Sequence, residues 1–555
     1  MFVFKNKILI AVITLFSINY AFSQNLERPK LVVGIIVDQM RWDYFYRFYD
    51  RYGDSGFRRM INEGFSCDNT MLNHLPTYTA VGHATAYTGS VPSLHGIASN
   101  DFYRKSTGEN IYCTGDNSVN CVGNPNVDAK NGKMSPRNLQ VTTITDELKL
   151  ATNFRSKVVG VAIKDRGSIL PAGHAADAAY WFDKETGNWI TSTWYRTSLP
   201  EWLKNYNEKK SWKKFVQQDW TPLYPIETYL QSAPNVNNYE DKTFYKQSFN
   251  FDFPIHLAQI AKTIGDGNMV CETPFGNTMT LDVARLAVDN EQLGADEITD
   301  FLAISFSSPD LIGHRCGPNS AKIEDNYLRL DKDLGDFFDF LDAKVGKGNY
   351  LVFLTADHAV AHNAQFLIDH KIAADNWNGK IYADSLNNFL SKKFNINKPV
   401  RNLDNYQVNF DFQKINASSA DFEQIKEETV KYLNKFPVFQ YVVDATKVAQ
   451  ATIPARIKEM IINGYNREFS GDIQLILKSG LYSDGDRIGT THGSWNPYDA
   501  HIPLVFFGWK ITPSHTYTEV YMTDIAPTLA AMLKIQMPSG CIGTPIFGKA
   551  EILGK

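Results

Sequence analysis

The sequence predicts an α/β fold with a mainly parallel sheet that helices cover on both faces. Five short apolar runs, each bounded by polar or turn residues, are typical of fully buried strands. Between them lie segments with apolar residues every three or four positions, as in amphipathic helices. The composition of the 555 residues, 43% hydrophobic and 21% charged, excludes disorder, collagen and coiled coils.

The expected elements follow in chain order. The strands are 30–37, 157–163, 300–305, 350–355 and 503–507. Residues 322–341 have the apolar spacing of an amphipathic helix, and Gly346 follows its end. Residues 523–535 are a second helix candidate, with Pro527 near the first turn, where proline is tolerated. This alternation of strands and helices indicates a single α/β domain.

Two stretches break the alternation, and we expect these two and a third, earlier stretch to be insertions that form a cap over the sheet. They cover about 101–139, 176–254 and 366–464. The second holds most of the tryptophans, which either stack a ligand or form a small core of the insertion itself, and we favour the core. The catalytic domain with its cap would then span 24–555.

The N-terminus is typical of a secretory signal peptide. Lys5 and Lys7 precede the apolar run 8–16, and the small residues Ala21 and Ser23 follow it. We expect residues 1–23 to be removed and the mature chain to be exported, in a bacterium to the periplasm. An uncleaved anchor is the alternative, but the run is short for a span of about 20 residues. No other stretch is long enough for a transmembrane segment.

The cysteine spacing and the net charge argue against a zinc-knuckle protein and against a nucleic-acid-binding protein. Six cysteines in an exported chain permit disulfides, and Cys113 and Cys121 are close enough in sequence for a loop-closing bridge. No C-x-x-C occurs, which argues against a structural zinc knuckle. The formal charge of −4 provides no basic excess for binding a nucleic-acid polymer.

Aspartates and histidines gather just past the predicted strands, where the functional groups of open α/β sheets collect. They are Asp38 after the first strand, Asp310 and His314 after the third, Asp357 and His358 after the fourth, and His492 ahead of the fifth. Each alone would usually be a helix cap or a turn residue. Together they suit zinc, and two ions about 4 Å apart form a clamp for phosphoryl transfer.

Four more residues belong to motifs with both a functional and a structural interpretation. Thr79 precedes a run of small residues that predicts a closely packed helix, so it is either the helix cap or a nucleophile at the anion-binding end. Lys164 and Arg166 follow a strand and either grip a dianion together or form an exposed charged turn. Asn100 alone would pass for a turn residue.

These motifs together resemble the alkaline phosphatase superfamily, and in particular the phosphate-irrepressible bacterial alkaline phosphatases (PafA type), relatives of the nucleotide pyrophosphatase/phosphodiesterases. The resemblance runs from about residue 31 to 546. The stretches that carry it are VDQMRWDY at 37–44, HLPTYTAVGHA at 74–84, SSPDLIGHRCGP at 307–318, TADHA at 355–359 and THGS at 491–494. Ala359 departs from the family pattern, which usually has Gly there, and we expect only a slight backbone adjustment.

The resemblance implies an alkaline-phosphatase-like fold with two Zn²⁺ per chain. Asp310, His314 and His492 would bind one zinc. Asp38, Asp357 and His358 would bind the other, and Thr79 would complete that site as the nucleophile and form a phosphothreonine intermediate. Asn100 would contact a phosphate oxygen. The stretch 163–183 is similar to the monoesterase version of the family, which implicates Lys164 and Arg166 in holding the remaining oxygens.

The expected function is hydrolysis of small phosphate monoesters over a broad substrate range. A phosphodiesterase or nucleotide pyrophosphatase with the same metals and nucleophile is the alternative, and a non-catalytic exported binding protein is the remote one. No G-x-S-x-G, G-x-x-x-x-G-K-[ST] or H-E-x-x-H motif supports a different enzyme class. The sequence leaves the oligomeric state open, and a monomer is our working expectation.

Overall fold

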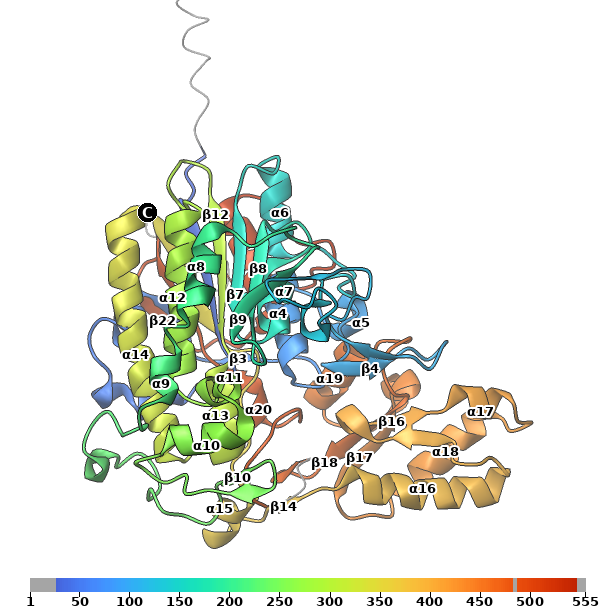
Figure 1. Ribbon diagram of the computed structural model, residues 1–555. Coiled ribbons are helices and arrows are strands. Elements are labelled where there is room, and N and C mark those ends of the chain that lie inside the picture. The colour runs from blue at the N-terminus through green and yellow to red at the C-terminus, as the bar shows by residue number, and fades with distance from the viewer. Residues whose placement is uncertain (1–25, 483–486, 547–555) are drawn as a thin grey trace, which may run out of the picture.

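A large mixed sheet forms the centre of the main body (Figure 1). The computed structural model describes residues 26–482 and 487–546, so the predicted signal peptide lies outside the described residues. The sheet has ten strands. In spatial order they are β22 (Ser514–Thr516), β2 (Phe65–Cys67), β21 (Leu504–Gly508), β13 (Tyr350–Thr355), β1 (Leu31–Val37), β12 (Asp300–Phe306), β7 (Val158–Ala162), β8 (Ala178–Asp183), β9 (Asn188–Ser192) and β6 (Cys121–Val122).

The five central strands of the sheet are parallel to one another, and an antiparallel pair flanks them on each side. Strands β13, β1, β12, β7 and β8 pair in parallel, whereas β21 runs antiparallel to β13, and β9 antiparallel to β8. All five predicted strands are present, with bounds that differ from the prediction by one residue at most. Every residue of β1 is buried, as expected for a strand covered on both faces. The predicted fold class is confirmed.

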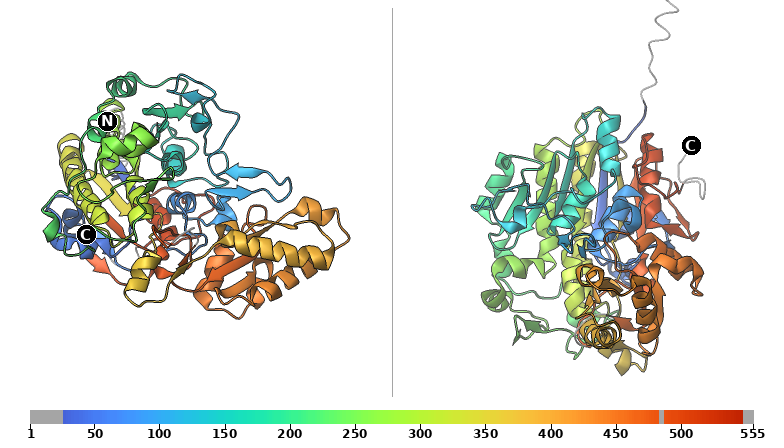
Figure 2. Two further views of the ribbon diagram at one scale, coloured as in Figure 1. Left: turned by 60° about the horizontal axis from the view of Figure 1, so that its bottom comes forward. Right: turned by 90° about the vertical axis from the view of Figure 1, so that its right-hand side faces the viewer.

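Helices lie on both sides of this sheet (Figure 2). Helices α12 (Phe275–Asn290) and α14 (Ala321–Leu341) pack against each other, and α12 also packs on β12. Helix α4 (Thr79–Thr88) packs against α7 (Asp165–Ala172) and α21 (Ile525–Leu533). The amphipathic helix predicted at 322–341 is α14. The helix predicted at 523–535 is a short 3-10 turn, Met522–Asp524, that continues into α21.

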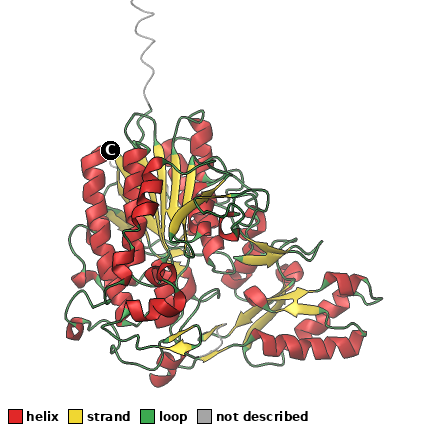
Figure 3. Ribbon diagram, viewed as in Figure 1, coloured by secondary structure: helices red, strands yellow, loops and turns green. Residues whose placement is uncertain are grey.

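Residues 377–444 and 472–477 build a lobe beside the main body, which we call the cap (Figure 3). Its four-stranded sheet has the order β15 (Val400–Asn402), β16 (Gln407–Phe410), β18 (Ile473–Leu477) and β17 (Phe439–Asp444). Helices α16 (Gly379–Phe394) and α18 (Phe422–Leu433) pack with it. A hydrophobic cluster separate from the main core fills this lobe.

The other two proposed insertions are arranged differently. Residues 101–112 form a hairpin of β4 (Asp101–Tyr103) and β5 (Asn110–Tyr112) that reaches toward the cap. Residues 178–192 differ from the expectation of a cap, because they form β8 and β9 at one side of the large sheet. Trp189 in β9 and Trp220 farther along the chain are fully buried, which favours a structural role for these tryptophans.

Two further expectations concern a disulfide between Cys113 and Cys121 and the presence of membrane-spanning segments. All six cysteines lie within the described residues, and all are free thiols. Cys113 and Cys121 belong to separate hydrophobic clusters, so the sequence gap of eight residues does not bring their side chains together. Among the described residues, no helix combines the length and the apolar character needed to cross a membrane.

Candidate active site

The residues predicted past the strand ends come together in two groups at one edge of the parallel sheet. Asp310, His314 and His492 form one group, and Asp38, Asp357 and His358 form the other. Within each group, one potential ligand atom from each residue lies within 4.8 Å of the others. These are the two triads expected from the sequence, and the carboxyl ends of β1, β12 and β13 deliver four of the six residues.

The first triad combines one helix with a distant loop. Asp310 and His314 are one turn apart on α13 (Ser308–Cys316), with Nε2 of His314 at 3.1 Å from Oδ1 of Asp310. Nε2 of His492 lies 3.6 Å from the same oxygen. Both imidazoles place Nδ1 against a backbone carbonyl, that of Thr490 at 2.9 Å and that of Thr77 at 2.7 Å. When Nδ1 donates to these carbonyls, Nε2 is left with a lone pair for a cation.

The second triad is more deeply buried and fits a cation. Nδ1 of His358 lies 3.0 Å from the carbonyl of Ala359, and Nε2 lies 3.6 Å from Oδ1 of Asp38 and 3.5 Å from Oδ2 of Asp357. These two oxygens are buried and have no hydrogen-bond partner among the described residues. Buried carboxylate oxygens without a partner are costly unless a cation neutralises them. The donor set, carboxylate oxygens and imidazole nitrogens, is one that zinc accepts.

Charge crowding at the site shifts the pKa values of its groups. Burial, together with the carboxylates of Asp310 and Asp357, raises the pKa of Asp38 well above its usual value. Burial lowers the pKa of His358 and of His492, which keeps both imidazoles neutral. Lys164 stands between the triads, because its Nζ lies 2.6 Å from Oδ2 of Asp38 and 2.6 Å from Oδ2 of Asp310.

Thr79 lies beside the second triad at the start of α4. It is the first residue of the helix, and Tyr78 is the extended residue that caps it. Its hydroxyl oxygen is 3.4 Å from Nε2 of His358. The next residue, Ala80, donates its backbone N–H to Oδ1 of Asn100 at 2.9 Å, so Asn100 lies at the same helix end. The hydroxyl oxygen of Thr79 therefore lies at the N-terminal end of α4, where the helix dipole is positive and favours an anion.

Arg166 is held by the hairpin and by its own helix. Its Nη1 donates to the hydroxyl of Tyr112 at 3.2 Å, and that hydroxyl donates to Oδ1 of Asp165 at 2.7 Å. Burial lowers the pKa of Arg166, but Tyr112 and Asp165 beside it outweigh burial and raise it, so the guanidinium is charged at every relevant pH. The exposed charged turn considered for Lys164 and Arg166 does not occur, because the Lys164 side chain turns inward and Arg166 is only partly exposed.

Two residues that support the site were not singled out from the sequence for that role. Gln39 follows Asp38 and donates its backbone N–H to Asp357 and its side-chain amide to Asp310. His83, on α4, is fully buried, and its Nδ1 lies 2.8 Å from the carbonyl of Thr79 and 3.4 Å from Oδ2 of Asp357. Its spacing of four residues from Thr79 was the available signal.

Known proteins match this chain over nearly its whole length. The type I phosphodiesterase/nucleotide pyrophosphatase family matches residues 32–499. A protein named calcium-transporting ATPase from Myroides odoratus is 50% identical over 98% of each chain. Alkaline phosphatase PafA from Elizabethkingia meningoseptica is 46% identical, with 96% of this chain and 95% of that protein covered.

A solved structure agrees with this match. The crystal structure of wild-type PafA aligns with a TM-score of 0.91 at 46% identity, and the alignment covers 95% of this chain and all of that one. The fold is therefore alkaline-phosphatase-like, and the resemblance to the PafA type stated from the motifs is confirmed. The match to the family profile covers more than half of the sequence. The chain therefore belongs to the type I phosphodiesterase/nucleotide pyrophosphatase family.

Proposed function

We propose that the protein is an exported alkaline phosphatase that uses two Zn²⁺ to hydrolyse a broad range of phosphate monoesters through a phosphothreonine intermediate. The observation that carries this proposal is the pair of triads with Thr79, Lys164 and Asn100 beside them. Relatives named alkaline phosphatase, at 46% identity for PafA, support it. A catalytic centre also explains the buried triads, which a non-catalytic binding protein would leave without a purpose.

The two triads would hold the metal ions. Asp310, His314 and His492 would bind one, and Asp38, Asp357, His358 and the hydroxyl of Thr79 would bind the other. When bound, two zinc ions supply positive charge that neutralises the attacking and leaving oxygens of a phosphoryl transfer.

The protein's own residues position the reacting groups. Thr79 attacks phosphorus, so that a bond forms between its hydroxyl oxygen and phosphorus while the bond to the alcohol oxygen breaks. Water then hydrolyses the phosphothreonine and releases phosphate. Asn100, Lys164 and Arg166 hold the phosphoryl oxygens in place. Phosphoryl transfer has a loose transition state, so this positioning and neutralisation supply most of the catalysis.

The charge around the substrate distinguishes a monoesterase from a diesterase. A phosphate monoester carries one more negative charge than a diester, and Lys164 and Arg166 add two cations for it. The rival proposal is a phosphodiesterase or nucleotide pyrophosphatase with the same nucleophile, which the description of the matched family favours. The cationic pair is our reason for preferring the monoesterase.

Metal analysis combined with mono- and diester kinetics tests the proposal. We expect two zinc ions per purified chain and a higher kcat/KM for a monoester than for a diester with the same leaving group. The variants Lys164→Ala and Arg166→Ala should each lower monoester kcat/KM by about 10²-fold, with a smaller effect on the diester. Thr79→Ala should abolish turnover of both.

Three results would contradict parts of this proposal. Fewer than about two metals per active chain would contradict the two-zinc assignment. Equal losses for mono- and diester in the Lys164 and Arg166 variants would contradict the assignment of that pair. Full activity of Thr79→Ala would exclude the phosphothreonine. For export, N-terminal sequencing of the protein from a periplasmic extract should begin at residue 24.

A further inference from the structure

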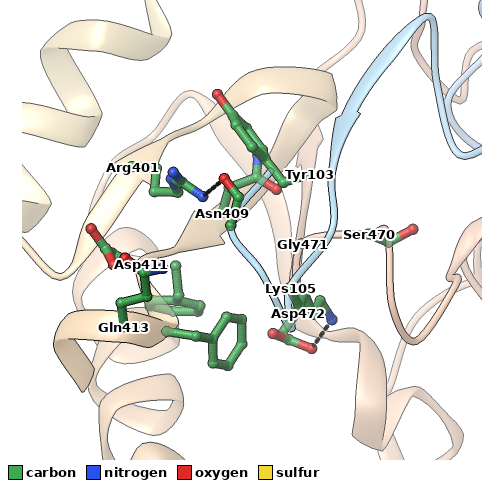
Figure 4. Close-up of a pocket in the computed structure, with 12 residues that line it drawn as sticks. Tyr103, Lys105, Arg401, Asn409, Asp411, Gln413, Ser470, Gly471 and Asp472 are labelled. Atoms are coloured by element: carbon green, nitrogen blue, oxygen red, sulfur yellow. Dashed lines mark hydrogen bonds and ion pairs between the residues drawn. The ribbon is translucent and has the colours of Figure 1, made fainter. Parts of the chain in front are cut away.

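The cap touches the segment that carries Asn100. The hairpin β4–β5 begins directly after Asn100, and several cap side chains bind it. Arg401 donates to the carbonyl of Gly108 at 2.9 Å. Nζ of Lys105 pairs with Oδ1 of Asp472 at 2.7 Å. Figure 4 marks the pair of Lys105 and Asp472 with a dashed line. Nδ2 of Asn402 donates to the hydroxyl of Tyr103 at 2.9 Å. These contacts hold β4 and the turn of the hairpin against the cap.

One cap residue binds both neighbours of Asn100. Oδ1 of Asn405 accepts a hydrogen bond from the hydroxyl of Ser99 at 2.8 Å. Nδ2 of Asn405 donates to the backbone carbonyl of Asp101 at 3.0 Å. The two polar ends of a single amide thus hold the residues before and after Asn100, and an alternative rotamer of Asn405 would break both bonds.

The backbone at Asn405 is unusual and explains why an asparagine stands there. Its φ is 59° and that of Tyr406 is 56°, both in the left-handed region. Asparagine tolerates this conformation better than most residues with a side chain. The tight turn aims the amide across the junction between the cap and the main body. A cleft of about 640 Å³ lies at this junction, and Asn405, Asn100 and Tyr78 all line it.

Asn100 itself is fixed on its remaining sides by the main body. Its Oδ1 accepts from the N–H of Ala80, and its backbone carbonyl accepts from the N–H of Cys113 at 2.9 Å. Because Oδ1 accepts the first of these bonds, Nδ2 is the part of Asn100 that can donate to a phosphoryl oxygen. Small displacements of such a donor weaken a hydrogen bond steeply, and misplacement by about 1 Å can cost up to about 10²-fold in rate.

We propose that Asn405 is a positioning residue through which the cap sets the place of Asn100 against the phosphoryl group. This inference rests on the proposed function, because it takes Asn100 as the donor to a phosphoryl oxygen. It makes the cap part of the active site, although no cap side chain belongs to either triad.

A double-mutant cycle with Asn100 tests this role. The main variant is Asn405→Gly, because glycine keeps the positive φ without strain and removes both hydrogen bonds. We expect it to lower monoester kcat/KM about tenfold and to weaken competitive inhibition by inorganic phosphate by a similar factor. In an Asn100→Ala background, the same change should alter either value by less than about twofold, since the positioned donor is gone.

Two further variants separate positioning from loss of structure. Asn405→Asp keeps the turn and the acceptor for Ser99 but loses the donor to Asp101, so its effect should be intermediate. Asn387→Ala is the matched control, because Asn387 also makes two amide hydrogen bonds, to the N–H and the carbonyl of Val400 within the cap. The control should leave kcat/KM and phosphate inhibition within about twofold of the wild type.

Each outcome decides between the two proposals. Equal losses for Asn405→Gly in both backgrounds, or the same loss in Asn387→Ala, would overturn the positioning role and leave the proposed function intact. The positioning role would also be overturned if Asn405→Gly left monoester kcat/KM unchanged while Asn100→Ala lowered it. If Asn100→Ala itself retained full monoester activity, the phosphate-binding assignment of Asn100 would fail, and the positioning role would fail with it.

Discussion

At the scale of single residues, Gln39 connects the two triads through both of its polar groups. Its N–H donates to Oδ1 of Asp357 at 3.1 Å, and its Nε2 donates to Oδ1 of Asp310 at 2.7 Å. Its φ of 67° is uncommon for a residue with a side chain and has a cost of about 1–3 kcal/mol. Gly313 leaves the space for it, because a Cβ there would lie 1.8 Å from Oε1 of Gln39. Such strain at a site is consistent with a positioning function.

We expect Gln39→Met to weaken metal binding about tenfold or more. Methionine has the same length and an unbranched chain but cannot donate to Asp310, and loss of a hydrogen bond to a metal ligand typically costs 10–100-fold in metal affinity. Competition with a zinc chelator measures the affinity, and activity at limiting zinc reports the consequence. Gln407→Met is a matched control, since Gln407 is a buried glutamine in the cap that also makes two hydrogen bonds. Unchanged zinc affinity in Gln39→Met would refute this role.

The site residues also differ in how far the sequence alone predicts them. Five of the six triad residues were predictable because they follow recognisable strands, and parallel strands bring their carboxyl ends to one edge. The sixth, His492, lies ahead of a predicted strand. The roles of Gln39 and Asn405 were not predictable, because an amide side chain can both donate and accept hydrogen bonds and so does not indicate a particular partner. Their contacts depend on a positive φ and on segments 270 or more residues away in sequence. No local pattern encodes either condition.

At the scale of elements, α4 and the end of β13 approach each other more closely than side chains would allow. Gly82 lies on α4 one turn after Thr79, and a Cβ at this position would lie 2.1 Å from the carbonyl oxygen of Asp357. This close approach sets the distance between Thr79 and the second triad. The run of small residues after Thr79 predicted such packing, and the structure identifies Asp357 as the neighbour.

Gly82→Ala should therefore impair activity and stability together. The added methyl group must push α4 or the Asp357 backbone aside, and overpacking of this kind costs about 1–3 kcal/mol. We expect a lower Tm and a fall in monoester kcat/KM of at least about tenfold, since Thr79 moves relative to His358. Gly53→Ala is the control, because a Cβ there lies 3.5 Å from Asp331 at an ordinary backbone angle. Wild-type values for both readouts in Gly82→Ala would disprove the tight contact.

The elements themselves were predictable to different degrees. Five of the ten strands of the large sheet were found, because continuous apolar runs bounded by turn residues leave few alternatives. Strands β8 and β9 were missed because they lie in a tryptophan-rich stretch without clear periodicity, although β8 pairs in parallel with β7 and β9 pairs antiparallel with β8. The cap was recognised only as a break in the alternation, since its four-stranded sheet depends on pairing between β16 and β18, which are far apart in the sequence.

At the scale of the whole molecule, the site joins parts of the chain that are distant in sequence. Asp38, Thr79, Asp310, Asp357 and His492 come from five separate segments. Three of them are buried carboxylates, and Lys164 is the cation that pairs with two of these. Bound metal ions would compensate this charge and link the segments, so metal binding should stabilise the entire fold.

Removing the metals should lower Tm, and the drop should grow between pH 7 and pH 9. In the metal-free protein the pKa values of Asp38 and His314 are raised above their usual values, Asp38 by burial and neighbouring carboxylates, His314 by Asp310 acting against burial. A raised pKa gives stability that is complete below the unfolded-state pKa and is lost as pH rises through the folded-state value. The lowered pKa values of His358 and His492 add no slope in this window, because an unfolded histidine is already neutral above about pH 7. The metal-loaded protein should not lose stability in this way, because the metal ions take the place of the protons on Asp38 and His314.

Scanning calorimetry of zinc-loaded and chelator-treated protein at both pH values measures this effect. A chelator-induced decrease of several degrees at pH 7 is expected, from a binding contribution of about 3–4 kcal/mol at zinc concentrations of 100 to 1,000 times Kd. Asp38→Asn gives the control, because without this carboxylate the metal-free protein should lose less stability between pH 7 and pH 9. If the chelator had no effect on Tm, or an effect that became smaller as pH rises, metal ions at the triads would not stabilise the fold by neutralising its buried carboxylates.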